Sequence, residues 1–228
     1  MAAYMKTTQP FAGVQKPARQ SIIREIRDRF APQTRAEYEA RVLALWRGRY
    51  REEQYLAIAY ARLYPAFVSA ASLPLYERMI REGAWWDFVD EIAVHLVGVV
   101  LRRDRAHSGR LLDRWIEDQD MWIRRTALIA HLTHKAETDA TRLFAHILLR
   151  AGDREFFIRK AIGWILREYG KTAPAAVRTF IRAHHARLSP LSLKEGARRL
   201  NPPLRFPKPN TARRSQGANP SASRRNVL

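Results

Sequence analysis

Apolar residues recur at helical spacing along almost the whole chain, and strand-like alternation is nearly absent. Between Ser21 and Phe30, for example, Ile22, Ile23, Ile26 and Phe30 form one apolar stripe. A half-buried strand requires an alternating pattern, so this feature restricts the chain to an all-α fold.

Further helices are expected between short breaks that contain Pro, Gly, Asp or Ser. They run approximately over 35–47, 52–64, 74–82, 86–102, 108–116, 121–133, 139–149, 155–169, 174–184 and 192–200. The helices that start near Glu52, Trp86, Trp122, Glu155 and Ser192 recur at roughly 35 residues, close to the period of two-helix solenoid repeats. We therefore predict a HEAT-like helical-repeat solenoid over residues 1–206, with a concave face suited to a long partner.

Residues 207–228 contain too little apolar material to offset the entropy cost of ordering them, so we predict a disordered basic tail. Such a tail can add non-specific DNA affinity or can simply be a solvated terminus, and the sequence favours neither.

Positive charge dominates the composition, because 41 Lys and Arg stand against 22 Asp and Glu, which gives a formal net charge of +19. Such a field attracts nucleic acid or an anionic membrane surface, and nucleic acid is the favoured partner. The longest apolar run, from Ile92 to Leu101, is about half the roughly 20 residues that cross a bilayer, and the N-terminus lacks a signal pattern. We expect no membrane partner and a cytoplasmic protein.

Several classes of enzyme are excluded by missing motifs. The chain has no Walker A, GxGxxG, HExxH, CxxC or GxSxG sequence. It also has no cysteine, which removes disulfides and thiolate chemistry. The seven histidines include the adjacent His184 and His185 but show no convincing ligand spacing, so we expect no metal and no cofactor.

Two residues at the start of one predicted helix are candidates for chemistry. Trp86 and Asp90 lie four residues apart and therefore share a helix face. A helical Trp is usually a core residue, and an Asp near a helix start usually complements the macrodipole. Asp87 fits that dipole role better because it is nearer the start. For Trp86 and Asp90 taken alone, the structural interpretation is favoured.

Two further helices combine cations with aromatic rings. Arg124 and Arg125 are adjacent within an apolar helix, so at least one should point away from the core. Either a bidentate phosphate contact or a salt bridge with an Asp such as Asp118 would suit it.

On the later helix, the overlapping faces carry Phe157, Lys160, Trp164 and Arg167, for which internal cation–π pairing is the alternative to ligand binding. Gly163 sits in the middle of that helix, which predicts the close approach of another helix or of a ligand backbone.

Taken together, these segments resemble the AlkD-like family of DNA alkylation repair glycosylases. The resemblance also includes the segments 4–6 and 13–19 and covers roughly residues 4–200. It is strongest over 85–90 and 156–169, which are long and unusual in composition. Members of the family usually have a further helix before the Tyr-Met-Lys segment at 4–6, and this sequence starts three residues ahead of it.

The resemblance implies a monofunctional glycosylase that hydrolyses the N-glycosidic bond of cationic alkylpurines such as 3-methyladenine and 7-methylguanine in duplex DNA. It also implies that the enzyme works without a base-flipping pocket. Asp90 takes the position of the catalytic carboxylate, and Trp86 and Trp164 form the aromatic pair beside the sugar of the lesion.

The same match places Tyr4 at the lesion-side tyrosine and Arg125 at the phosphate-binding arginine. The other residues expected to contact DNA are Lys6, Lys160 and Arg167. We expect a bacterial, nucleoid-associated monomer.

Two other classes of function remain as alternatives. One is a non-catalytic helical-repeat module that binds DNA structures or a protein, since a solenoid scaffold does not determine activity. The presence of Asp90 with both tryptophans argues against it, because a pure binder needs no carboxylate facing polyanionic DNA. The other is a peripheral protein of anionic membranes, which would need a strongly amphipathic exposed helix.

Overall fold

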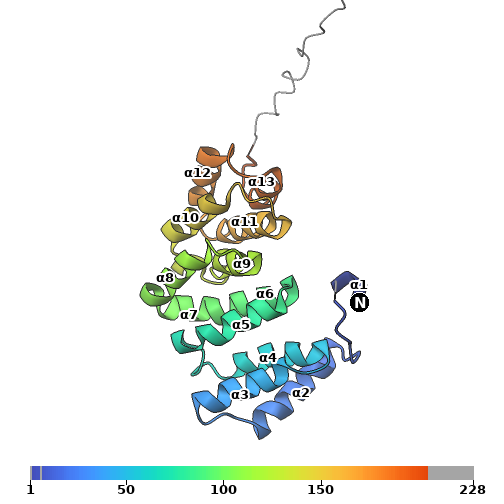
Figure 1. Cartoon of the computed structure of the whole chain (residues 1–228). Coiled ribbons are helices and arrows are strands. Elements are labelled where there is room, and N and C mark those ends of the chain that lie inside the picture. The colour runs from blue at the N-terminus through green and yellow to red at the C-terminus, as the bar shows by residue number, and fades with distance from the viewer. Residues whose placement is uncertain (1, 6, 205–228) are drawn as a thin grey trace, which may run out of the picture.

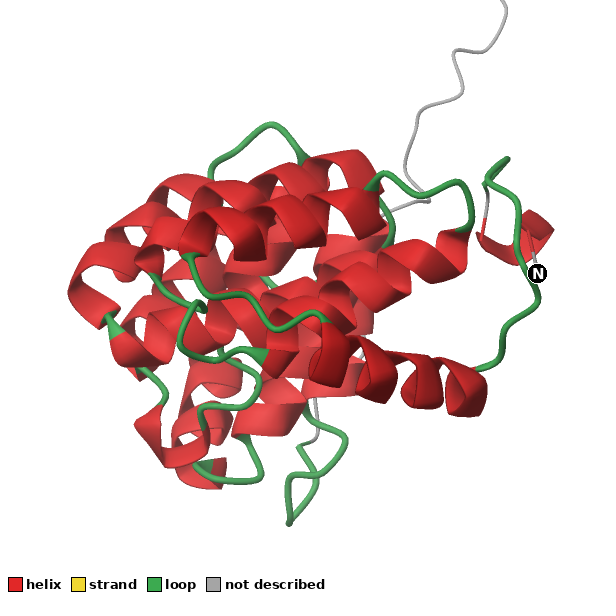
Figure 2. Cartoon of the chain, turned by 90° about the horizontal axis from the view of Figure 1, so that it is seen from below, coloured by secondary structure: helices red, strands yellow, loops and turns green. Residues whose placement is uncertain are grey.

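The computed structural model describes residues 2–5 and 7–204, so Lys6 and the predicted tail at 207–228 lie outside the described residues. All regular elements in the described ranges are helices or helical turns (Figure 2). The predicted all-α fold is confirmed. No helix among these residues is both long enough and apolar enough to cross a bilayer.

Five helices form an inner row in which each contacts the next, as the succession of labels in Figure 1 shows. The row consists of α4 (Arg51–Leu63), α6 (Trp86–Ile92), α9 (Met121–Ile129), α11 (Phe156–Tyr169) and α13 (Pro190–Gly196). Their starts are separated by 35, 35, 35 and 34 residues. The predicted helical repeat is therefore present, with a period more regular than the sequence pattern indicated.

An outer row packs against the inner one. It consists of α3 (Arg35–Trp46), α5 (Leu73–Gly83), α8 (Arg105–Trp115), α10 (Ala140–Arg150) and α12 (Pro174–His184). The hydrophobic core lies between the rows and extends from Tyr38 in α3 to Ile181 in α12. At the N-terminal end, α2 (Lys16–Arg29) packs on α4, while α1 (Ala2–Met5) precedes residues 7–15, which form no helix (Figure 2).

Local signals fix where many helices begin. The side chains of Thr34, Asp104, Asp120, Asp139 and Ser189 each accept a hydrogen bond from a backbone N–H in the first turn of the following helix. A cap of this kind is worth about 1 kcal/mol. Proline in the first turn of α2, α5, α12 and α13 serves the same end, because its missing N–H is not needed there.

Two expected helices differ from the structure. The segment predicted over 86–102 is divided into α6, a π-helical turn η2 (Ala93–Val97) and α7 (Gly98–Arg103). Gly98 is required there, because a Cβ atom would lie 2.3 Å from the carbonyl oxygen of Ala130. In the first predicted stripe, Ile23 and Ile26 pack on the core, but Ile22 and Phe30 are exposed.

The connections between helices include two short 3-10 turns, η1 (Ala70–Ser72) before α5 and η3 (Lys135–Glu137) before α10.

Candidate active site and nucleic-acid interface

Two adjoining cavities lie along the inner helices and share Trp86 and Trp164. The first, here the Asp90 cavity, has a volume of about 580 Å³, and its lining includes Lys16, Arg19, Tyr55, Trp86, Asp90 and Trp164. The second, here the Tyr4 cavity, has about 480 Å³, and its lining includes Tyr4, Trp86, Arg125, Lys160, Trp164 and Arg167. The seven described residues singled out from the sequence therefore line one or other cavity.

The two adjacent tryptophans at the start of α6 take different places. The ring of Trp85 packs against Trp122 and Phe157, with ring centroids 5.9 and 5.6 Å away. Trp86 is half-buried and lines both cavities. Trp85 is the N-cap of α6 with an extended backbone, and Trp86 is the first helical residue. One indole therefore enters the packing between helices while the other faces the cavities.

Asp90 lies one helical turn after Trp86, and both of its carboxylate oxygens are bound by Arg125 of α9. The Nε to Oδ1 distance is 2.7 Å and the Nη2 to Oδ2 distance is 2.8 Å. Burial raises the pKa of Asp90, and the guanidinium of Arg125 counteracts that rise. The pKa of Asp90 stays above its ordinary value, while the bidentate pair favours the carboxylate form of this side chain, which lines the cavity.

Arg125 itself is buried, and only some of the N–H groups of its guanidinium have partners within the protein. Nη1 donates to the carbonyl oxygen of Phe157 at 2.6 Å, in addition to the two bonds to Asp90. A guanidinium has five N–H groups, so two remain. Arg125 can therefore hold Asp90 and still donate to an oxygen of a ligand in the Tyr4 cavity.

Asp87 also lines the Asp90 cavity and pairs with an arginine, but this arginine comes from α4 and not from α9. Its carboxylate binds Arg51 of α4 at 2.7 and 3.0 Å and accepts from the Tyr55 hydroxyl at 2.5 Å. Burial and the neighbouring Asp87 raise the pKa of Tyr55 to about 12, which keeps the phenol a donor. The first-turn position expected for Asp87 is observed, and a buried ion pair between helices is added to it.

Lys160 and Arg167, one turn on either side of Trp164, converge on a single carboxylate. Glu195 of α13 accepts from Lys160 Nζ at 3.2 Å and from Arg167 Nη1. Gly163 permits this approach, because a Cβ there would lie 2.6 Å from Cβ of Glu195. The predicted close approach at Gly163 is thus made by another helix. The two cations pair with an acid, and Phe157 has Arg125 as a neighbour, with the guanidinium 5.8 Å from its ring centroid.

Glu195 is the functional-site residue that sequence reasoning missed. It lies 35 residues after Lys160, and Arg125 lies 35 residues after Asp90. Arg51 and Asp87 are 36 residues apart. Equivalent positions of neighbouring repeats lie side by side, so opposite charges separated by one repeat were the signal that would have found these pairs.

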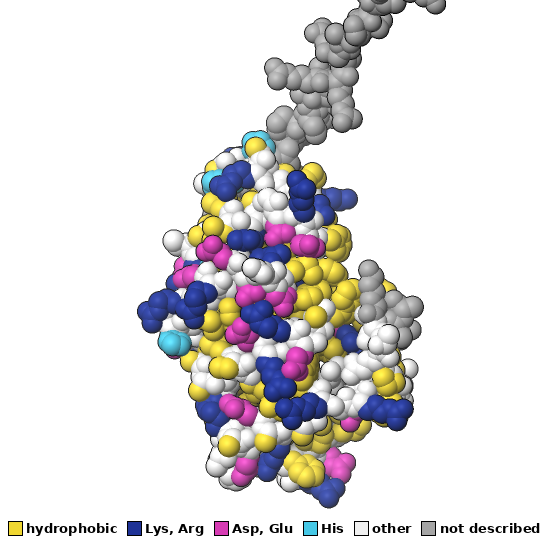
Figure 3. Space-filling model, in the orientation of Figure 1, with side chains coloured by type: hydrophobic (Ala, Val, Ile, Leu, Met, Phe, Trp, Pro, Cys, Tyr) yellow, Lys and Arg dark blue, Asp and Glu magenta, His cyan; other side chains and the backbone are white. Residues whose placement is uncertain are grey.

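The salt bridge expected for Arg124 or Arg125 is present but not with the predicted partner. Arg125 pairs with Asp90, whereas Arg124 contacts the carboxylate of Asp153 at 3.3 Å and the carbonyl oxygen of Asp118 at 2.8 Å. The carboxylate of Asp118 is taken by Arg81 of α5. The face in Figure 3 accordingly shows basic and acidic side chains interspersed between apolar ones, and not a uniformly basic surface.

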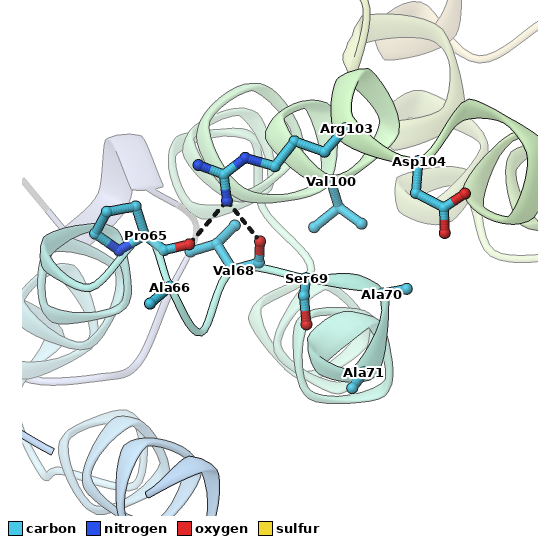
Figure 4. Close-up of a pocket in the computed structure, with 9 residues that line it drawn as sticks. All are labelled: Pro65, Ala66, Val68, Ser69, Ala70, Ala71, Val100, Arg103 and Asp104. Atoms are coloured by element: carbon cyan, nitrogen blue, oxygen red, sulfur yellow. Dashed lines mark hydrogen bonds between the residues drawn. The ribbon is translucent and has the colours of Figure 1, made fainter. Parts of the chain in front are cut away.

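A further cavity, of about 490 Å³, lies near the C-terminal ends of α4 and α7 (Figure 4). Its one guanidinium, Arg103, donates to the carbonyl oxygens of Pro65 and Val68 at 2.8 and 3.0 Å. Its one carboxylate, Asp104, caps α8. Trp86 and Arg103 are separated by about 25 Å of helix, so this cavity is distinct from the two described above.

Comparisons with known proteins agree with this architecture. The family model described as "DNA alkylation repair enzyme" matches residues 1–200. A solved structure described as a predicted DNA alkylation repair enzyme from Enterococcus faecalis is 30% identical, with a TM-score of 0.81 over 89% of this chain and 93% of that one. No curated protein matches. Because the family model covers most of the sequence, the chain belongs to the DNA alkylation repair enzyme family, whose role is in DNA repair.

Proposed function

We propose that the protein is a monofunctional DNA glycosylase that excises cationic alkylated purines from duplex DNA, with Asp90 as the catalytic carboxylate. The observation that carries this proposal is that Asp90 lines a cavity together with Trp86 and Trp164, while Arg125 binds both oxygens of its carboxylate. A carboxylate that lines such a cavity suits the stabilisation of a positively charged reaction centre.

The chemistry asked of these residues is limited. Alkylation at N3 or N7 makes the purine a cation, so it departs as a neutral base without protonation by an enzyme acid. The C1′–N bond breaks, the bonding electrons leave with the base, and positive charge develops on the deoxyribose. Asp90 would stabilise that charge and orient the water that adds at C1′, while its carboxylate assists removal of the proton from that water. The electron-rich faces of Trp86 and Trp164 would attract the polarised C–H groups of the sugar.

The cations around the site suggest how DNA is held. Arg125, Lys160 and Arg167 face the Tyr4 cavity and would contact backbone phosphates. We propose that the enzyme approaches from the backbone side and needs no base-flipping pocket, because both cavities are open to solvent. Specificity would then follow from the lability and charge of the lesion.

The direct test is Asp90→Asn in single-turnover release of 7-methylguanine from methylated duplex DNA. We expect release to fall about 100-fold, the usual scale for removal of a preorganised charge-stabilising group. DNA affinity and the circular dichroism spectrum are measured on the same variant to separate catalysis from folding and binding. Glu77→Gln removes the same charge from an exposed pair on α5 and serves as the matched control.

Undiminished release by Asp90→Asn would disprove the catalytic assignment. Binding of alkylated duplex by the wild type without any base release would favour the non-catalytic DNA-binding module instead, since both depend on the same cationic surface.

A further inference from the structure

The N-terminal segment that carries Tyr4 is fastened to the body at the start of α4. Glu52, a buried residue in the first turn of α4, accepts the backbone N–H of Ala12 at Oε2 (2.9 Å) and that of Gly13 at Oε1 (3.0 Å). The backbone N–H of Arg51 donates to the carbonyl oxygen of Pro10 at 3.0 Å. Three hydrogen bonds thus tie residues 10–13 to one helix start.

We call the Glu52 carboxylate, with its hydrogen bonds from Ala12 and Gly13, the clasp. A buried carboxylate is costly unless its oxygens are hydrogen-bonded, and here each oxygen serves one main-chain amide. Gly13 has φ = +80°, in the left-handed region that favours glycine. The local conformation of the segment therefore depends on both the carboxylate and the glycine.

Tyr4 belongs to a short helix that precedes these hydrogen bonds in the sequence. α1 has four residues, and an isolated helix of one turn is unstable in water. Tyr4 is 69% exposed, yet it lines the cavity that contains Trp86, Arg125 and Trp164. Its position over the site is consequently set by the anchor at 10–13 more than by its own packing.

The same helix start also holds α6. Arg51, next to Glu52, binds Asp87, which lies one turn before Asp90. Two consecutive residues of α4 thus connect the Tyr4 segment and the helix of the proposed catalytic carboxylate to one point.

We infer that Glu52 is a positioning residue that places Tyr4 over the Trp86–Trp164 site for contact with bound DNA. The inference rests on the proposed function where base release is measured. The anchoring of the segment itself can be measured without catalysis. Loss of the clasp should weaken the binding of alkylated duplex through Tyr4 and leave the release step at saturating DNA nearly unchanged.

The experiment is a double-mutant cycle with Glu52→Gln and Tyr4→Ala, in which the dissociation constant for a methylated duplex is measured for each protein. We expect either single substitution to weaken binding about tenfold, the scale of a lost hydrogen bond to a charged group. The double variant should bind no more weakly than Tyr4→Ala alone, because a clasp that acts through Tyr4 has nothing left to position.

The matched control is Glu53→Gln. Glu53 is the next residue, and its carboxylate accepts the backbone N–H of Tyr50 in a capping box, so it stabilises the same helix start without touching residues 10–13. Its effect on binding should be small and independent of Tyr4. If Glu52→Gln does not fold, Gly13→Val loosens the segment from outside the core, since a Cβ there meets nothing within 4 Å and only the backbone conformation is strained.

Limited proteolysis provides the readout that needs no catalysis. Cleavage within residues 7–15 should be faster in Glu52→Gln and in Gly13→Val than in the wild type and in Glu53→Gln. Additive losses of affinity in the cycle, or equal cleavage in all variants, would overturn the inference. If the cycle and the cleavage behave as expected but the wild type releases no base, the proposed function fails while the positioning role stands.

Discussion

The two ends of α6 present the same ion pair in two different settings. Asp87 binds Arg51 of α4, and Asp90, one turn later, binds Arg125 of α9, each through two hydrogen bonds of 2.7–3.0 Å. The hydrogen-bond geometry alone therefore does not distinguish a structural ion pair from one in a functional site.

The surroundings make the difference. The Asp87 carboxylate is 8% exposed and also accepts from Tyr55, while Arg51 stacks on the Phe88 ring at 4.0 Å. The Asp90 carboxylate is 16% exposed and faces a cavity beside two indoles. Both aspartates line the Asp90 cavity, but Asp87 is the less exposed of the two and has Tyr55 as a third partner. Arg51–Asp87 thus has the features of a structural pair, whereas Arg125–Asp90 leaves its carboxylate more open to a ligand.

Breaking the first pair should have the largest effect on stability. Arg51→Met leaves Asp87 buried without its counter-charge, so we expect the free energy of unfolding to fall by about 3–5 kcal/mol. Urea denaturation followed by circular dichroism measures this. A decrease in the free energy of unfolding below about 1 kcal/mol would show that this ion pair does not hold α4 and α6 together.

Breaking the second pair should cost less stability and change the pH dependence instead. For Arg125→Met we expect a loss of about 2 kcal/mol, between the values for exposed and fully buried pairs. Burial raises the pKa of Asp90 and Arg125 lowers it, so removing Arg125 raises it further. If ionised Asp90 is required, base release is lost on acidification at a higher pH than in the wild type. An unchanged acid limb would contradict the role of Arg125.

The pH dependence of stability reports on a different buried group, the side chain of His131. Burial, together with His134 and His146, lowers the pKa of His131 to about 3. An unfolded histidine titrates near pH 6.5, so between about pH 3 and 6.5 the unfolded state binds the extra proton and stability falls with falling pH, by up to ~1.4 kcal/mol per unit. His131→Leu should flatten this slope in denaturation curves from pH 7 to 4. The exposed His107→Leu should retain it.

The smallest effect is expected where a carboxylate competes with DNA. Glu195→Gln releases Lys160 and Arg167 from their shared acid, so the slope of log K against log salt should steepen by about one unit, with affinity at low salt rising several-fold. Fluorescence anisotropy with a labelled duplex at several salt concentrations measures both. A shallower slope would mean that Glu195 orients these cations for phosphate binding and does not compete with it.

Local sequence signals were sufficient for the repeat but not for the pairings. Apolar periodicity and the breaks that contain Pro, Gly, Asp or Ser predicted the inner helices near 52, 86, 122, 155 and 192, against observed starts at 51, 86, 121, 156 and 190. The division of the segment after Trp86 was not predicted, because it depends on the approach of Ala130 to Gly98. Likewise, nothing near Asp90 in the sequence indicates Arg125 as its partner.

By itself, then, the sequence determined an all-α repeat, a strongly basic protein, and, through its resemblance to a known family, the residues on which chemistry was expected. These follow from patterns within one helix or from composition. The tertiary structure decided which arginine each of two nearby aspartates binds, which acid shares the cations of α11, and that Glu52 holds the segment of Tyr4. The physical reason is that these contacts join residues about one repeat or more apart, where only the stacking of the helices brings the charges together.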